Sequence, residues 1–275
     1  MAATVVDAPL VERRELSPLC FLLRLGSPEV ARRSRPGQFV MVRRAEHWPV
    51  LLSRPLSVAD VGPSEEEPEW FDLLLQIRRE GTRALSELSP GERLRVTGPL
   101  GFGFTVVRDA AAHILLAGGV GAAPFPLLAR WIRRDEAARQ APLYYLIGAP
   151  RADRLFFVDR LGELGAQVLT ATEDGSAGLR GRVTGLLPRV EEELGGLDGV
   201  ALYVTGPPGL LRASAQLAGE RGLRCQLSLE SRMGCGIGLC QGCTVKVRDK
   251  PGEGWHYRRV CYEGPVMWAQ DVIFD

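Results

Sequence analysis

The cysteines near the C-terminus constrain this chain more than any other feature. Four of the six cysteines follow the spacing C-x₄-C-x₂-C with one later Cys, at Cys235, Cys240, Cys243 and Cys261. Glycines at positions 234, 236, 238 and 242 allow positive φ and bring backbone N–H groups close to sulfur. This spacing is the plant-type pattern of a [2Fe–2S] cluster. We therefore predict that these four thiolates ligate such a cluster.

A structural zinc ion is the main alternative for four cysteines. Zinc sites usually pair two short C-x₂₋₄-C knuckles, whereas here three cysteines share one loop and the fourth stands alone. The spacing therefore favours the iron–sulfur cluster. The other two cysteines, Cys20 and Cys225, lie in apolar strand-like runs and are interpreted as buried core residues.

Charge and hydropathy argue against several classes of protein. The 34 basic and 33 acidic side chains give a net charge of +1, and no basic stripe alternates with aromatic residues, so nucleic-acid binding has no support. The N-terminus lacks the charged and apolar regions of an export signal. The longest uncharged stretch, 114–129, is too short for a membrane span and contains Gly and Pro. We expect a cytoplasmic protein without a membrane partner, where disulfides are rare.

The pattern of apolar residues changes along the chain and predicts three units. In residues 1–105, short runs rich in Val, Leu and Phe alternate with Pro- and Gly-containing turns, which indicates a small antiparallel barrel. In residues 106–226, strand-like runs at 113–117, 143–147, 167–172 and 201–204 alternate with helical stretches. That alternation predicts an α/β domain, a parallel sheet with helices on both faces. Residues 227–275, rich in Gly and Cys, form a small third unit.

A first candidate nucleotide site is the segment Arg54-Pro55-Leu56-Ser57. An Arg held by a following Pro can clamp a pyrophosphate through two hydrogen bonds, and a nearby Ser can hydrogen-bond a ring edge. Downstream, Gly81-Thr82 could open a helix whose free N–H groups cradle phosphate. A surface Arg before Pro is nevertheless the more common explanation of such a motif, so both interpretations stay open.

A second candidate nucleotide site is the glycine turn containing Gly118, Gly119 and Gly121. It follows a predicted strand and precedes a predicted helix, as a dinucleotide-binding turn does. Pro124 stands where a Rossmann motif has its third glycine, and a plain tight turn explains the pattern equally well. Gly206-Pro207 ends another predicted strand at the same edge of the sheet, where ligands of such sheets bind.

Taken in order, these motifs resemble the ferredoxin–NADP reductase superfamily, in which an FAD-binding barrel precedes a nicotinamide domain. The segment Gly98–Phe104 marks the junction between the two. Residues 228–243 and 260–266, together with Thr172–Ser176 and Gly181–Thr184, are similar to electron-transfer subunits of type B dihydroorotate dehydrogenase. The resemblance covers nearly the whole chain.

The resemblance implies cofactor contacts that the motifs alone leave open. It implies FAD contacts at Arg54, Pro55, Leu56, Ser57, Leu74, Leu75, Gln76, Gly81 and Thr82, and NAD contacts at Gly118, Gly119, Gly121, Gly206 and Pro207. Where the family tends to carry a Tyr-Arg pair, this chain has Leu75-Gln76, which removes an aromatic flavin contact and a phosphate charge. Arg78 or Arg79 is the candidate to compensate.

The resemblance also implies a partner. The family acts with a separate FMN-containing catalytic subunit, which oxidises dihydroorotate to orotate in pyrimidine biosynthesis, in a heterotetramer of two plus two chains. Electrons would pass from FMN through the [2Fe–2S] cluster and FAD to NAD⁺.

No side chain of this chain stands out as a catalytic acid or base. His47, His113 and His256 are scattered and are interpreted as structural, so the base for dihydroorotate is expected on the partner. Two alternatives stay open. One is a reductase of the same architecture that serves another partner, of the sulfide dehydrogenase or ferredoxin–NADP transhydrogenase type. The other is a zinc-stabilised binding module without catalytic activity.

Overall fold

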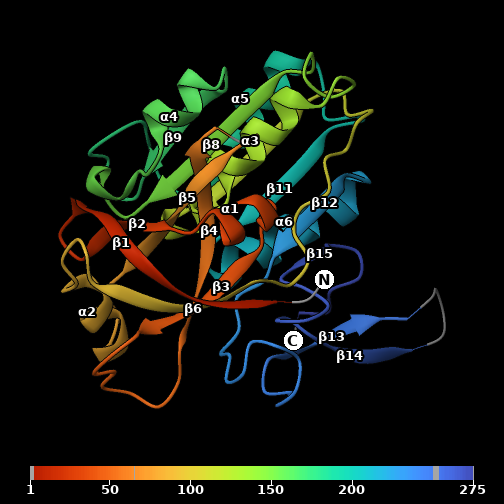
Figure 1. Cartoon of the computed structure of the whole chain (residues 1–275). Helices are drawn as coiled ribbons and strands as arrows, with labels where there is room; N and C mark the ends of the chain where they lie inside the picture. The colour runs from red at the N-terminus through yellow and green to blue at the C-terminus, as the bar shows by residue number, and fades with distance from the viewer. Residues whose placement is uncertain (1–2, 65, 250–253, 275) are drawn as a thin grey trace.

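The computed structural model describes residues 3–64, 66–249 and 254–274. Figure 1 shows an N-terminal barrel in red to yellow, an α/β layer above it in green to cyan, and a small C-terminal unit in blue. Among the described residues, no helix combines the length and the apolar composition that a membrane span needs.

The N-terminal unit is a closed antiparallel barrel, as predicted, with strand order β1-β2-β5-β4-β3-β6. Its core consists of inward-facing Leu, Val and Phe side chains, Leu73 and Phe71 among them. A short helix begins where Ser27 caps it, because the Ser27 hydroxyl accepts a hydrogen bond from the Val30 N–H. The elements are β1 Thr4–Ser17, β2 Cys20–Gly26, α1 Pro28–Arg33, β3 Phe39–Arg44, β4 Arg54–Pro63, β5 Pro68–Gln76, α2 Glu80–Ser86 and β6 Arg93–Leu100.

The second unit is built on a seven-stranded sheet of order β10-β9-β8-β7-β11-β12-β15, parallel except for the last strand. Along β7, Ile114 and Leu116 join the core on one face while Leu115 joins the core on the other, so both faces are buried. The predicted parallel sheet covered by helices is therefore confirmed. Its elements are β7 His113–Gly118, α3 Phe125–Arg134, β8 Leu143–Ala149, α4 Val158–Glu163, β9 Gln167–Thr172, β10 Leu179–Arg180, α5 Leu187–Leu194, β11 Ala201–Thr205, α6 Pro208–Arg221 and β12 Arg224–Ser228. Three 3₁₀ turns, Gly119–Ala122, Ala152–Arg154 and Val183–Leu186, connect them.

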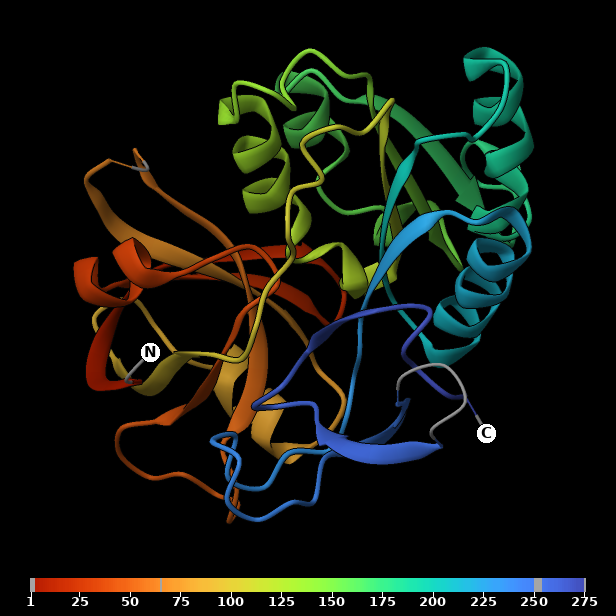
Figure 2. The ribbon, with the colours of Figure 1, turned by 90° about the vertical axis from the view of Figure 1, so that its right-hand side faces the viewer.

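The C-terminal segment leaves β12, forms the cysteine loop and then an antiparallel hairpin of β13 Thr244–Arg248 and β14 Trp255–Arg259. It ends by adding β15 Val266–Trp268 to the edge of the large sheet, antiparallel to β12. Figure 2 shows this segment lying against the barrel and the α/β unit together. We keep the division into 1–105, 106–226 and 227–275 as a proposal, with β15 completing the sheet of the second unit.

Candidate functional site

Two cavities meet where the barrel faces the carboxyl ends of the parallel strands. The first, which we name the barrel cavity, has a volume of about 250 Å³ and lies between β3, β4 and β5, the turn after β7 and the segment after β12. Six of the predicted flavin contacts line it: Pro55, Leu56, Ser57, Leu74, Gln76 and Thr82. The fold thus brings together residues from three separate stretches of the barrel sequence.

Arg54 and Gly81 lie together beside the barrel cavity. The Arg54 guanidinium packs over Gly81 at the start of α2, and a Cβ on that residue would lie 2.6 Å from the Arg54 Nε. Only glycine allows this approach, because any side chain there would displace the guanidinium. Arg54 Nη1 also donates a hydrogen bond of 2.7 Å to the Leu52 carbonyl, which holds it in place. A cation over the first turn of a helix suits a diphosphate group.

Leu75, which the resemblance implied as a flavin contact, lies instead in the barrel core. Side chains alternate along a strand, so Leu74 and Gln76 face the cavity while Leu75 points into the barrel. Its side chain has no exposed surface. The Leu75 side chain therefore does not line the barrel cavity, and the flavin contact implied at this position stays a prediction.

The second cavity, which we name the sheet-end cavity, has a volume of about 560 Å³, a size typical of small-molecule sites. Of the predicted nicotinamide contacts, Gly118, Gly119, Gly206 and Pro207 line it, whereas Gly121 lines the barrel cavity. The Thr205 hydroxyl donates a hydrogen bond to the Gly121 carbonyl and ties the end of β11 to the glycine turn. The two turns therefore form one wall.

Sequence reasoning missed several residues of the sheet-end cavity. Glu173, Arg182, Thr184 and Phe156 all line it, and none was predicted as a contact. The first three belong to the segments 172–176 and 181–184, which carried the resemblance but received no role. Glu173 directly follows β9, and Arg182 and Thr184 lie at the start of the next turn, Val183–Leu186. That position was the available signal, because ligands bind beyond the carboxyl ends of parallel strands.

Three polar residues line both cavities: Gln76, Arg78 and Glu230. Arg78 Nε donates a hydrogen bond of 3.1 Å to Gln76 Oε1, and the Arg78 backbone N–H donates one of 2.8 Å to Thr82 Oγ1. Although the Glu230 side chain is open to the cavities, the surrounding protein raises the pKa of its carboxyl group, and Arg78 partly offsets this. A cation and a carboxylate thus stand where the two cavities join.

The four predicted cluster ligands lie in one region as free thiols. Cys243 and Cys261 are buried, Cys235 is half-buried and Cys240 is exposed. Backbone N–H groups point at three of the sulfurs: those of Ile237 and Cys240 at Cys235 Sγ (3.5 and 3.4 Å), Gly238 at Cys261 Sγ (3.2 Å) and Cys261 at Cys243 Sγ (3.4 Å). Such bonds stabilise thiolates and tune a bound cluster.

The pKa values of these thiols follow from the same contacts. Burial acts to raise the pKa of Cys235, but hydrogen bonds from backbone N–H groups outweigh it and bring the pKa to about 7. Burial and the neighbouring Cys243 raise the pKa of Cys261 to about 12. Deprotonating this buried thiol therefore calls for a cation, as metal ligation supplies.

The sulfurs approach one another as two pairs, Cys235 with Cys240 and Cys243 with Cys261. A [2Fe–2S] cluster with four cysteine ligands binds two thiolates at each iron, so this pairing suits it. Across the described part of the chain, no group of three or more Cys, His, Asp or Glu side chains is arranged to hold a metal ion. The donor set fits the cluster, and the ligation itself stays a prediction.

The three histidines lie away from both cavities. Burial lowers the pKa of His113 to about 4, so this side chain is neutral at pH 7. His256 contacts Asp249 near the exposed hairpin, and His47 sits in a loop with positive φ. These positions are consistent with the structural roles expected for them.

Comparison with known proteins gives a family for this architecture. Residues 230–273 match the iron–sulfur cluster binding domain of dihydroorotate dehydrogenase B. Over its full length, the fold is similar to a solved structure of an NADH-dependent reduced ferredoxin–NADP oxidoreductase, with a TM-score of 0.78 and 25% identity, covering 98% of this chain and 90% of that chain.

Two curated relatives carry the name dihydroorotate dehydrogenase B (NAD(+)), electron transfer subunit. The protein of Caldanaerobacter subterraneus subsp. tengcongensis is 39% identical over 243 residues, which cover 88% of this chain and 89% of the relative. The protein of Bacillus cereus strain Q1 is 33% identical over 266 residues, 96% of each chain. The resemblance inferred from the motifs is confirmed. The chain belongs to the family of dihydroorotate dehydrogenase B electron-transfer subunits.

Proposed function

We propose that this chain relays electrons between an FMN-containing dihydroorotate dehydrogenase catalytic subunit and NAD in pyrimidine biosynthesis. One observation carries the proposal: the two cavities and the cysteine loop form a continuous series. Gln76, Arg78 and Glu230 belong to both cavities, and the segment from Ser228 to Met233 lines the barrel cavity before it enters the loop at Cys235. A relay needs this adjacency.

The barrel cavity holds FAD in this proposal. Arg54 and the first turn of α2 bind its diphosphate, Ser57 hydrogen-bonds a polar edge of the ring, and Arg78 supplies a positive charge at the junction of the cavities. When bound, FAD accepts a hydride from nicotinamide and exchanges single electrons with an iron–sulfur cluster. The protein supplies position, charge and the exclusion of water.

The sheet-end cavity holds NAD. Gly118, Gly119, Gly206 and Pro207 let the cofactor approach the backbone, and Arg182 supplies a positive charge at the wall of the cavity. The cavity meets the barrel cavity at Arg78 and Glu230, so these side chains would border the place where bound nicotinamide and flavin meet.

The cysteine loop packs on the barrel at β3, next to β4, the strand that carries the proposed flavin contacts Arg54 to Ser57. Met41 of β3 pairs with Pro55 of β4, and the Met41 side chain packs against Gly236, which has a φ of +74°. A side chain at position 236 would collide with Met41 and separate the loop from the barrel. Met41 thus contacts the cysteine loop through its side chain and pairs in the sheet with a strand that lines the barrel cavity.

The outer face of the loop is apolar and exposed, which suits a protein partner. Leu239 is 77% exposed and Tyr262 is 54% exposed, close in sequence to the ligands Cys240 and Cys261. Large exposed apolar side chains at one site mark interaction surfaces. This face docks the FMN subunit, in a heterotetramer of two plus two chains in the cytoplasm, and the partner provides the base for dihydroorotate.

The purified chain and its complex test this proposal. The chain should carry flavin and iron–sulfur absorption, NADH should bleach its flavin under anaerobic conditions, and it should co-purify with an FMN-containing subunit. A colourless protein with stoichiometric zinc would contradict the redox role. Flavin bleaching without any dihydroorotate-dependent activity in the complex would favour a related reductase, such as the ferredoxin–NADP oxidoreductase that shares this fold at 25% identity.

A further inference from the structure

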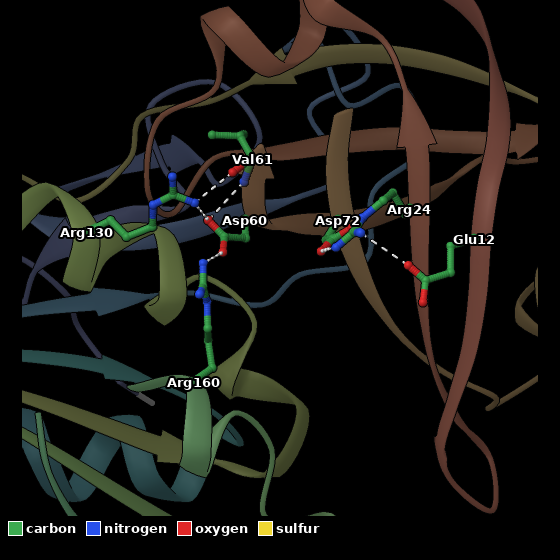
Figure 3. A network of polar contacts seen from close by, with 7 residues as sticks. All are labelled: Glu12, Arg24, Asp60, Val61, Asp72, Arg130 and Arg160. Carbon is green, nitrogen blue, oxygen red and sulfur yellow. Dashed lines mark hydrogen bonds and ion pairs between the residues drawn. The ribbon is translucent and has the colours of Figure 1, made fainter. Parts of the chain in front are cut away.

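Two buried carboxylates lie opposite each other on barrel strands β4 and β5. Asp60 and Asp72 are direct partners in the strand register, with relative exposures of 7% and 5%. Burying a carboxylate is costly unless cations and hydrogen bonds compensate. Figure 3 shows that both carboxylates are satisfied by arginines, which come from different parts of the molecule.

The partners of Asp60 come from the α/β unit. Arg130 of α3 donates from Nη1 to Asp60 Oδ1 at 2.8 Å, and Arg160 of α4 donates from Nη2 to Asp60 Oδ2 at 3.1 Å. Arg130 Nη1 also donates to the Val61 carbonyl at 2.7 Å. One barrel carboxylate thus holds two helices of the second unit (Figure 3).

The partner of Asp72 stays within the barrel. Arg24 of β2 makes two parallel hydrogen bonds to it, each of 2.9 Å. Arg24 also pairs with Glu12 of β1 at 3.2 Å and stacks over the Trp70 ring at 3.6 Å. Asp60 and Asp72 are therefore buried to a similar extent on paired strands. They differ in their partners, because the ion pairs of Asp60 cross to the α/β unit and that of Asp72 stays within the barrel.

The elements joined by Asp60 are the ones that carry the two cavities. Strand β4 lines the barrel cavity with Pro55 to Ser57, three residues before Asp60. Helix α3 begins directly after Ala123 and Pro124, which line the barrel cavity, and the glycine turn before them lines the sheet-end cavity. Leu127 of α3 belongs to the same buried cluster as the barrel core. The ion pair between Asp60 and Arg130 thus links β4, which lines the barrel cavity, to α3, which follows the glycine turn of the sheet-end cavity.

We propose that Asp60 is a positioning residue, which sets the spacing between flavin and nicotinamide by clamping α3 and α4 to β4. This inference rests on the proposed function. Hydride transfer needs the reacting atoms about 3–3.5 Å apart, and a misplacement of about 1 Å can lower a rate about 100-fold. A second link between α3 and the barrel, Arg134 to Glu66, is exposed on both sides and contributes little.

The test compares Asp60→Asn with Asp72→Asn in the FAD-loaded chain. In stopped-flow reduction by saturating NADH, Asp60→Asn should lower the limiting rate of flavin bleaching at least about tenfold. The half-saturating NADH concentration and the bound FAD should change less than twofold, because neither cavity contains Asp60. Asp72→Asn should lower the melting temperature and leave the limiting rate within twofold.

Hydrogen–deuterium exchange gives a readout independent of activity. Asp60→Asn should speed exchange of amides in α3, whereas Asp72→Asn should speed exchange in β2 and β5. Equal slowing of flavin reduction by both variants would overturn the proposal, since it would reflect general loosening of the barrel. An unchanged limiting rate in Asp60→Asn would also overturn it.

A milder variant covers the case in which Asp60→Asn fails to fold. The Arg160 side chain is 43% exposed, so Arg160→Gln removes one of the two arginine partners of Asp60 without leaving a buried cavity. It should slow the limiting rate about threefold, or less than Asp60→Asn; no slowing would contradict the clamp. If NADH fails to bleach the wild-type flavin, the proposed function fails. Hydrogen–deuterium exchange then tests the clamp by itself: faster exchange in α4 of Arg160→Gln would support it, and unchanged exchange there would contradict it.

Discussion

The barrel cavity and the cysteine loop are built in opposite ways. The cavity gathers side chains from strands and turns that lie far apart in the sequence, between Phe39 and Pro265. Three of the four cysteines lie in one stretch, from Cys235 to Cys243. A site made by one segment can be inferred from spacing, whereas a site made by many segments depends on the fold. The same difference predicts how substitutions affect each site. Loss of one cysteine should abolish cluster binding in the loop, whereas loss of one side chain in the barrel cavity should only weaken FAD binding.

The largest expected effect is on the cysteine loop. Cys240→Ser should abolish the reduced-state EPR signal of the cluster and leave FAD binding and flavin bleaching by NADH intact, because Cys240 is exposed and contributes to neither cavity. Cys225→Ala is the matched control, since burial raises the pKa of that thiol to about 12 and disfavours a thiolate. An unchanged signal in Cys240→Ser would mean that the ligand set is wrong.

A graded effect is expected in the barrel cavity. Arg54→Ala removes the cation that we propose binds the cofactor diphosphate, which should weaken FAD binding by about 2 kcal/mol, roughly 30-fold in Kd. Gly81→Ala should weaken it about tenfold without removing the charge, because its Cβ would lie 2.6 Å from Arg54 Nε. Arg83→Ala, on the exposed side of α2, is the control. Isothermal titration of the apoprotein with FAD measures all three; equal affinities would break the assignment.

The smallest effect concerns the outer face of the loop. Leu239→Glu places a charge on an apolar surface and should weaken association with the FMN subunit by about 1.4 kcal/mol, a factor of about ten. The cluster and the flavin of the isolated chain should be unaffected, because the side chain is 77% exposed. Leu179→Glu, an exposed leucine on β10, is the control. Equal loss of affinity in both variants would show that the effect is not specific to the loop.

The sequence was sufficient for whatever depends on local pattern. Predicted strands at 113–117, 143–147, 167–172 and 201–204 match β7, β8, β9 and β11 within two residues at each end. The glycine turn and the cysteine loop were likewise found from spacing. These features have short-range causes: period-2 burial in strands, positive φ at glycine, and ligands that share a loop.

Features that depend on packing were not predicted. Nothing near Leu75 indicates that it faces the core while Leu74 faces the cavity, since both belong to one apolar run in β5. The return of β15 to the edge of the large sheet and the pairing of Asp60 with Arg130, 70 residues away, depend on how separate elements dock. Glu173 and Arg182 carried the resemblance, but only the fold shows that they line a cavity.

The central claim is that electrons cross this chain between a partner subunit and NAD. The most direct test reconstitutes the complex anaerobically and follows NADH formation from dihydroorotate and NAD⁺. The account predicts NADH only when the FMN subunit and this chain are both present, and its loss when Cys240→Ser replaces the wild-type chain. Equal NADH formation by the FMN subunit alone, or full activity with Cys240→Ser, would contradict it.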